Sequence, residues 1–204
     1  MIAEQIRARG VRDERVLEAM SRVPREQFVP EAFRSAAYED RPVSIGLGQT
    51  ISQPYIVGYM TEVLRLEASH RVLEIGTGCG YQTAVLAQLA REVFSVELLP
   101  ELAGRARATL AGLQYTNVHI RTGDGYQGWP ERAPYDRILG AAAAASVPPA
   151  LLDQLADGGI IVLPIGTDYQ ELRVLQKRGE TLDTLATLPV RFVPMIKGSS
   201  TGGD

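Results

Sequence analysis

Cysteine and long apolar runs are scarce in this sequence, and each scarcity argues against a class of protein. Cys79 is the only cysteine among 204 residues, so an intrachain disulfide and a cysteine-only metal site are both excluded. We expect no metal. No run of about 18 apolar residues that would span a bilayer occurs, and Glu4, Arg7 and Arg9 interrupt any apolar core of a signal peptide. The sequence therefore predicts a cytoplasmic protein with no membrane partner.

Excess charge of one sign is also lacking. The formal net charge is −3, with a pI of about 5.5, so no cationic field is available to collect phosphate backbones. Nucleic acid is therefore not an expected partner. Hydrophobic residues make up 45% of the chain, enough to bury the core of one domain, which we place at residues 1–197. A monomer is the favoured expectation for the oligomeric state.

The first 53 residues form a predicted N-terminal extension. Asp13 is a suitable N-cap for a helix that has Val16, Leu17 and Met20 on one face. The later part of the extension, residues 38–53, is rich in glycine and small polar residues. We predict an ordered substrate loop there, without helix or strand.

From residue 54 onward the pattern predicts a doubly wound α/β core. Pro54 suits the first turn of a helix. Strand-like and helix-like segments then alternate, which implies a mostly parallel sheet with helices on both faces. The predicted strands are 71–75, 92–97, 117–121, 135–140 and 160–166, and the helices between them are 82–90, 101–113 and 149–156. Two or three antiparallel strands follow, and the tail 198–204 is expected to be disordered.

A glycine-rich turn joins the first predicted strand to the next helix. Gly76, Gly78 and Gly80 have the spacing GxGxG, and glycine allows the backbone to approach a ligand closely. A dinucleotide fingerprint would read GxGxxG and place a pyrophosphate on the helix N-terminus. The third glycine is therefore one position early for a dinucleotide.

Acidic residues follow the next two predicted strands. A carboxylate at Glu97 can accept both hydroxyls of a ribose, which by itself fits NAD and S-adenosylmethionine equally. Asp124, with Gly125 beside it, can accept from an adenine amine. Taken singly, Glu97 is more simply interpreted as a charge at a helix N-terminus and Asp124 as a turn residue. A cofactor that carries a sulfonium cation and no phosphates explains both the glycine spacing and the acidic lining, so we predict S-adenosylmethionine.

Glu74 lies inside the first predicted strand and leaves two interpretations open. It orients the amino group of the cofactor through water, or it is a structural carboxylate that bonds the amides of the glycine loop.

Five segments carry a resemblance to one known family. They are YEDRPVSIGLGQTISQPY (38–55), VLEIGTGCGYQTAVLA (72–87), GDGYQGWP (123–130), VPPALLDQL (147–155) and RFVPM (191–195). Together they resemble the protein-L-isoaspartate O-methyltransferase family, and the resemblance covers almost the whole chain. Its most specific part is GQTISQP, because other methyltransferases share the glycine motif but not this loop.

The resemblance implies a class I methyltransferase fold and an acceptor of one kind. The acceptor is the free α-carboxylate of L-isoaspartyl residues in damaged proteins and peptides, and its methyl ester collapses to a succinimide. A carboxylate with a pKa of roughly 3.5 arrives ionised, so no general base is required. The family's active-site serine falls at Ser52, with Thr50 and Ile51 in the same loop between cofactor and peptide. The alternative for Ser52 is that it only caps the helix that opens at Pro54.

One stretch departs from the family pattern and keeps rival functions open. Residues Gly140 to Ser146 read GAAAAAS, where relatives usually continue with an apolar residue and a threonine. The rival functions are methylation of a different carboxylate, a cofactor-binding protein without turnover and, last, an NAD-dependent oxidoreductase.

Overall fold

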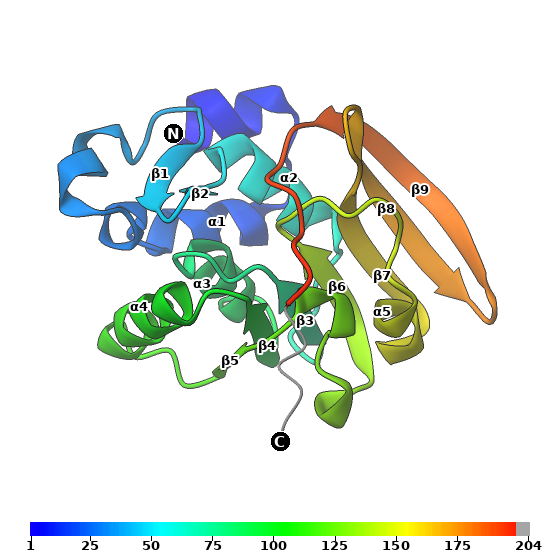
Figure 1. Cartoon of the computed structure of the whole chain (residues 1–204). Helices are drawn as coiled ribbons and strands as arrows, with labels where there is room; N and C mark the ends of the chain where they lie inside the picture. Colours follow the sequence, from blue (N-terminus) through cyan, green and yellow to red (C-terminus); the bar gives the residue numbers. More distant parts are fainter. Residues whose placement is uncertain (199–204) are drawn as a thin grey trace, which may run out of the picture.

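A seven-stranded sheet forms the centre of the computed structural model, which describes residues 1–198 (Figure 1). The first five strands in spatial order run parallel, and the last two are antiparallel, as expected from the alternating pattern. In that order they are β5 (Val118–Thr122), β4 (Glu92–Glu97), β3 (Arg71–Ile75), β6 (Tyr135–Gly140), β7 (Leu155–Gly166), β8 (Gln170–Arg178) and β9 (Thr181–Val190). The predicted disorder of the tail concerns mainly residues 199–204, which lie outside the described residues.

Helices cover both faces of this sheet, which confirms the predicted α/β class. They are α2 (Pro54–Val63), α3 (Tyr81–Ala87), α4 (Pro100–Gly112) and α5 (Pro149–Gln154), with short 3-10 turns η5 (Gly125–Gln127) and η6 (Pro130–Arg132). Side chains alternate along each strand, so Val72 packs toward α2 and α3 while its neighbour Leu73 packs toward α5. Within residues 1–198 no helix combines the length and the apolar character needed to cross a bilayer.

The N-terminal extension packs beside α2 and α3 as a largely helical layer. Asp13 caps α1 (Glu14–Arg22) by accepting a hydrogen bond from the Arg15 amide at 2.9 Å, and Val16, Leu17 and Met20 are buried, as predicted. Shorter helical turns complete this layer: η1 (Ile2–Ile6), η2 (Arg7–Arg9), η3 (Arg25–Phe28) and η4 (Glu31–Ala36).

The segment 38–53 is not a loop without strands, and this prediction was wrong. It contains a small antiparallel hairpin of β1 (Val43–Gly46) and β2 (Gln49–Ile51). The turn is closed by three consecutive residues with positive φ, of which the middle one is Leu47 at 53°. Strands of four and three residues are too short to produce a visible apolar alternation, which explains why the pattern was not recognised.

The C-terminal segment, residues 191–198, crosses over the carboxyl ends of the strands (Figure 1). It pairs with the alanine run that follows β6: the Ala143 amide donates to Val193 O at 2.8 Å, and the Met195 amide donates to Ala143 O at 2.7 Å. Small side chains in this run permit the approach. The unusual sequence between Gly140 and Ser146 therefore has a structural role in seating the end of the chain.

Candidate active site

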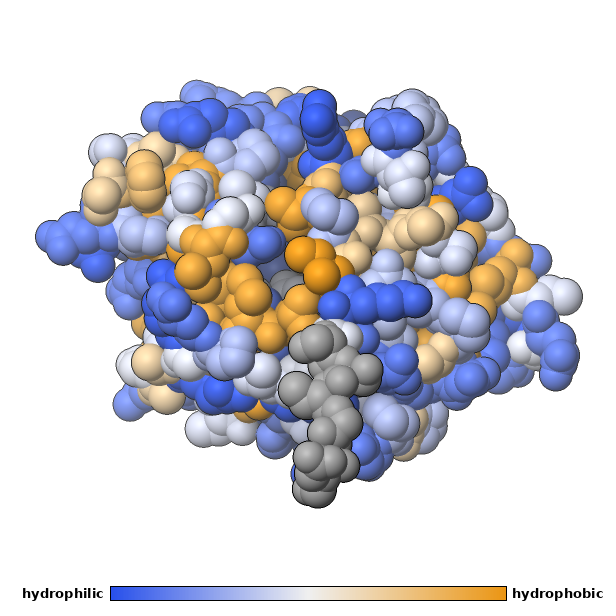
Figure 2. Space-filling model, viewed as in Figure 1, coloured by the Kyte–Doolittle hydropathy of each residue, from blue (hydrophilic) through white to orange (hydrophobic). Residues whose placement is uncertain are grey.

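A cavity of about 230 Å³ opens at the carboxyl ends of β3 and β4, where open α/β sheets bind ligands. In Figure 2 its mouth is a hollow bordered by apolar surface near the C-terminal segment. Apolar side chains supply much of the lining, and two of them, Leu47 and Ile196, are about half exposed at 48% and 58%. Of the predicted site residues, the cavity is lined by Thr50, Ile51, Ser52, Gly76, Gly78, Glu97 and Gly125.

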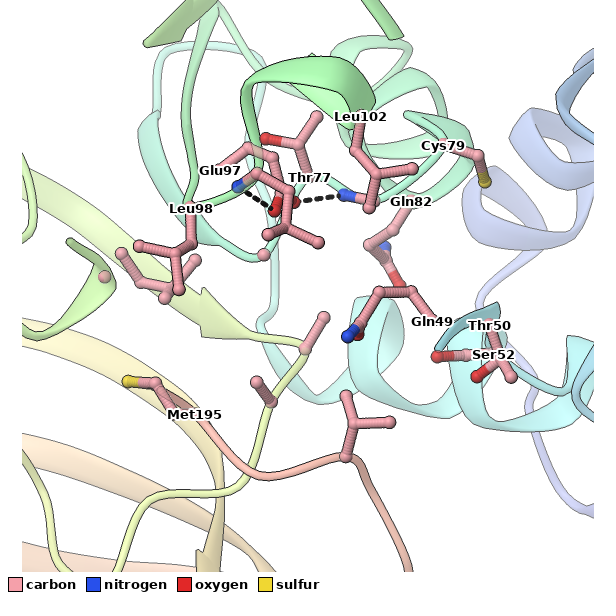
Figure 3. Close-up of a pocket in the computed structure, with 18 of the residues that line it drawn as sticks. Gln49, Thr50, Ser52, Thr77, Cys79, Gln82, Glu97, Leu98, Leu102 and Met195 are labelled. Carbon is pink, nitrogen blue, oxygen red and sulfur yellow. Dashed lines mark hydrogen bonds between the residues drawn. The ribbon is translucent and has the colours of Figure 1, made fainter. Parts of the chain in front are cut away.

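The glycine loop and Glu97 form one wall as a hydrogen-bonded unit. Glu97, only 6% exposed, accepts from the Gly78 amide at 2.8 Å through Oε2 and from the Leu99 amide at 3.0 Å through Oε1 (Figure 3). Gly76 and Gly78 have φ values of 91° and 57°, a region in which any other side chain would be strained. Each carboxylate oxygen keeps a second lone pair, so the carboxylate can still accept from ligand hydroxyls.

The opposite wall comes from the hairpin and the residues that follow it. In Figure 3, Gln49, Thr50 and Ser52 lie across the cavity from Glu97 and Leu98. The helix α2 has Gln53 as its N-cap, and in the described part of the chain no side chain caps it. The alternative interpretation of Ser52 as the helix cap is therefore wrong, and its side chain remains free to contact a ligand.

Glu74 lies beneath the cavity and does not line it. Its Oε2 accepts from Thr83 Oγ1 at 2.5 Å and from Ser95 Oγ at 2.6 Å, and Ser95 in turn is 2.5 Å from Thr77 Oγ1. Complete burial raises the pKa of Glu74 to about 7. The prediction that Glu74 bonds the glycine-loop amides was wrong in its donors: the donors are hydroxyls, and the loop amide of Gly78 bonds Glu97 instead. Through Ser95, Glu74 is connected to Thr77, which does line the cavity.

Two other predicted residues also lie outside the cavity lining. Gly80, with φ 91°, is the N-cap of α3, and an added Cβ would come 3.1 Å from Leu110 Cδ1, so Gly80 packs closely against α4. Its contact with a cofactor stays a prediction. Asp124 caps η5 by accepting from the Tyr126 amide at 2.8 Å, which agrees with its interpretation as a turn residue. Contact between Asp124 and a cofactor stays a prediction.

The ionisable groups near the cavity offer no evident general base. Cys79 lines the cavity, but burial raises the pKa of its thiol to about 11, so the thiol stays protonated at neutral pH. His70 accepts from the Glu67 amide, His119 stacks on Phe94, and neither lines the cavity. Residues 1–198 contain no group of three or more metal-ligating side chains that could hold an ion.

Several lining residues were not identified from the sequence. Thr77 was overlooked inside the glycine motif, and Gln49 inside GQTISQP. Val193, Pro194 and Met195 join the lining because the C-terminal segment returns to the glycine loop. The motif RFVPM marked this segment, but only the pairing with Ala143 shows where it lies.

A mostly parallel sheet that ends in antiparallel strands, with a glycine loop and an acidic residue at the ends of adjacent strands, is the arrangement of a class I methyltransferase. The GxGxG spacing separates it from the dinucleotide-binding folds, which share the rest. The model of the family protein-L-isoaspartate(D-aspartate) O-methyltransferase matches residues 1–200. The chain belongs to this family.

Relatives match along nearly their full length. A protein-L-isoaspartate O-methyltransferase from Picosynechococcus sp. is 55% identical over 202 residues, which are 99% of this chain and 90% of that one. One from Anaeromyxobacter dehalogenans is also 55% identical and covers 95% of both chains.

Two solved structures share the fold. A protein-L-isoaspartate O-methyltransferase has a TM-score of 0.86 and 32% identity, over 92% of this chain and 62% of its own. A candidate protein-L-isoaspartate O-methyltransferase from Plasmodium falciparum, in complex with S-adenosyl-L-homocysteine, has a TM-score of 0.81 and 27% identity, over 97% of both chains.

Proposed function

We propose that this chain transfers the methyl group of S-adenosylmethionine to the free α-carboxylate of L-isoaspartyl residues in proteins and peptides. The observation that carries the proposal is the position of Ser52 and Glu97 on opposite walls of one cavity. Membership in the family supports the choice of acceptor. We further propose that residues 1–197 act as one unit, as a cytoplasmic monomer that binds no nucleic acid.

The cavity suits this cofactor on two grounds. The glycine loop presents backbone without Cβ atoms, and Glu97 offers acceptors for ribose hydroxyls. Leu98 and Leu102 add apolar surface for a purine ring. The cofactor, when bound, supplies an electrophilic methyl group on a sulfonium. Asp124 and Gly125 remain proposed contacts for its adenine, and Glu74 remains a proposed contact to its amino group through water.

The acceptor would enter from a second cavity that shares residues with the first. This cavity, about 930 Å³, is lined in part by the end of the edge strand β9. It shares Thr50, Ser52, Ala141, Val193 and Pro194 with the first cavity. Arg9 and Arg191 also line it, which favours an anionic acceptor. An extended peptide can lie along this edge.

The chain's residues would position the acceptor and exclude water. Ser52 Oγ donates a hydrogen bond to one oxygen of the ionised carboxylate, while the other oxygen attacks the methyl carbon. The new O–CH3 bond forms as the S–CH3 bond breaks, which gives the methyl ester and S-adenosylhomocysteine. No proton is transferred, so the reaction needs no general base. Alignment of two bound reactants contributes on the order of 7 to 11 kcal/mol to such a reaction.

A pair of peptides tests the proposal. They differ only in an L-isoaspartyl or L-aspartyl linkage at one position, and methyl transfer is followed with labelled S-adenosylmethionine. We expect base-labile label on the isoaspartyl peptide alone. Label on both peptides would indicate a broader carboxylate acceptor, and label on neither, with the cofactor bound, would contradict the proposal.

A further inference from the structure

Arg25 is a completely buried arginine directly behind Ser52. It lies in η3, and its relative exposure is 0%. The guanidinium donates to two main-chain carbonyls: Nε to Ala37 O at 2.6 Å and Nη2 to Ser52 O at 2.7 Å. Both distances are short, as expected for hydrogen bonds from a charged donor.

Two main-chain carbonyls and one aromatic ring stabilise the buried positive charge of Arg25. The guanidinium carbon lies 4.7 Å from the ring centroid of Tyr81, at the start of α3. Among residues 1–198, no carboxylate is a partner of Arg25, and its Nη1 is buried without a partner. Burial lowers the pKa of Arg25, yet an arginine remains protonated in proteins. Because an unsatisfied buried charge is costly, moving either carbonyl away is strongly disfavoured.

The two carbonyls are the two ends of one segment. Ala37 follows η4, and Ser52 precedes α2, so the two hydrogen bonds from Arg25 hold together the two ends of a loop that contains the whole β1–β2 hairpin. We call these two ends, Ala37 and Ser52, the neck of the loop. A second bond, from Gln53 Nε2 to Asp40 O at 3.0 Å, ties the same neck. The buried guanidinium of Arg25 therefore fixes the two ends of the hairpin loop relative to each other.

We infer that Arg25 is a positioning residue for methyl transfer: its bond to Ser52 O fixes the Ser52–Gln53 peptide unit and so aims the Ser52 side chain at the acceptor carboxylate. The inference rests on the proposed function, because it assigns Ser52 a role in that reaction. Arg25 itself lines neither the cofactor cavity nor the acceptor cavity.

A double-mutant cycle between Arg25→Lys and Ser52→Ala tests this inference. Lysine keeps the charge but cannot reproduce the two-armed geometry. The maximal velocity is measured on the isoaspartyl peptide. It is divided by the concentration of sites that bind S-adenosylhomocysteine in a calorimetric titration, which gives a kcat per functional site. Unfolded protein in the sample therefore does not lower this kcat. We expect Arg25→Lys to lower this kcat at least tenfold in the wild-type background and less than threefold in the Ser52→Ala background.

Equal factors in the two backgrounds would overturn the inference, because a merely structural effect is additive. A loss below threefold for Ser52→Ala alone would overturn it as well, while leaving methyl transfer itself established. An inactive wild type would instead contradict the proposed function.

Two further variants distinguish the effect of a loosened neck on kcat from general effects of substitution on folding. Arg137→Lys is the matched control, because Arg137 also donates to carbonyls, Leu64 O at 2.6 Å and Arg65 O at 3.3 Å, and it lies outside both cavities. We expect it to leave kcat per site within twofold of wild type. Ala37→Gly loosens the other end of the neck with Arg25 in place. It should lower kcat per site at least threefold, again only when Ser52 is present, and an unchanged kcat would overturn the inference.

Discussion

Residues at the cavity have two roles: some side chains face the space for a ligand, and others fix the backbone or side chains that line it. Glu97 does both, because its carboxylate binds two amides and still borders the cavity. Ser52 faces the cavities through its side chain, while its carbonyl is bound from behind by Arg25. Glu74 supports the wall from behind, because two hydroxyls, those of Ser95 and Thr77, lie between its carboxylate and the cavity. Residue type alone does not distinguish these roles.

The role of Ser52 predicts a specific kinetic defect. Ser52→Ala should lower kcat/KM for the isoaspartyl peptide by roughly 10- to 100-fold, the effect of one hydrogen bond to a charged group. The affinity for S-adenosylhomocysteine should stay within threefold of wild type, because the glycine loop and Glu97 are untouched. Steady-state kinetics and calorimetry measure the two quantities. The control is Ser21→Ala, an exposed serine on α1, and an equal loss in both variants would contradict the assignment.

The buried carboxyl of Glu74 predicts a dependence of stability on pH. Its pKa is raised to about 7 in the folded chain, against 4.5 for the unperturbed group. Between these values the folded state holds a proton that the unfolded state has released, so wild-type stability falls as pH rises through this window.

The slope for this one group is at most about 1.4 kcal/mol per pH unit. Glu74→Gln removes this pH dependence, because glutamine does not ionise. The free energy of unfolding of the variant minus that of wild type should therefore increase from pH 5 to pH 7 and level off above pH 7. Urea unfolding at pH 5, 6, 7 and 8 measures the difference. A constant difference across this range would show that Glu74 ionises at its ordinary pKa in the folded chain.

At the level of elements, the sequence predicted those parts that have a strong period. The central strands β3, β4 and β6 were predicted to the residue, because each has a short group of apolar residues bounded by charged residues or turns, such as Val93 and Phe94 in β4 or Ile138 and Leu139 in β6. The hairpin was missed, because its strands are so short that the alternation of buried Val43 and Ile45 with exposed Ser44 does not stand out in the sequence. Arg105 of α4 also holds the hairpin, by donating to Ile45 O at 3.2 Å. Contacts from a distant helix leave no local signature.

The end of β6 predicts a packing defect on enlargement. A Cβ added at Gly140 would lie 2.1 Å from Cδ1 of Leu163, a fully buried side chain of β7. Gly140→Ala should therefore destabilise the chain by about 1 to 3 kcal/mol. Leu163→Val removes part of the obstruction, so the double variant should lose less than the sum of the two single losses. Urea unfolding of the four proteins measures the coupling, and strict additivity would mean that the two sites do not touch.

Across the whole molecule, the cofactor wall followed from topology and the acceptor wall did not. Right-handed crossovers bring the ends of β3 and β4 together, so the glycine loop and Glu97 were predicted as neighbours from spacing alone. The acceptor side is assembled from the hairpin and the C-terminal segment, which are about 140 residues apart in the chain. Only the family resemblance connected them in the sequence, and only the fold shows how Ala141 to Ala144 let the C-terminal segment approach.

Binding at this cavity predicts a stabilisation of the whole fold by one cofactor and not another. S-adenosylhomocysteine should raise the free energy of unfolding by about 2.7 kcal/mol at one hundred times its Kd, with about 1.4 kcal/mol more for each further tenfold. NAD should give no shift, because the GxGxG loop is not the dinucleotide spacing.

Glu97→Gln should weaken the binding of S-adenosylhomocysteine at least tenfold, since it removes the charge from the acceptor of the ribose hydroxyls. The matched control is Glu101→Gln on the exposed start of α4, and thermal unfolding with graded ligand measures all three proteins. A comparable shift with NAD, or full stabilisation of Glu97→Gln, would place the cofactor elsewhere than on this wall.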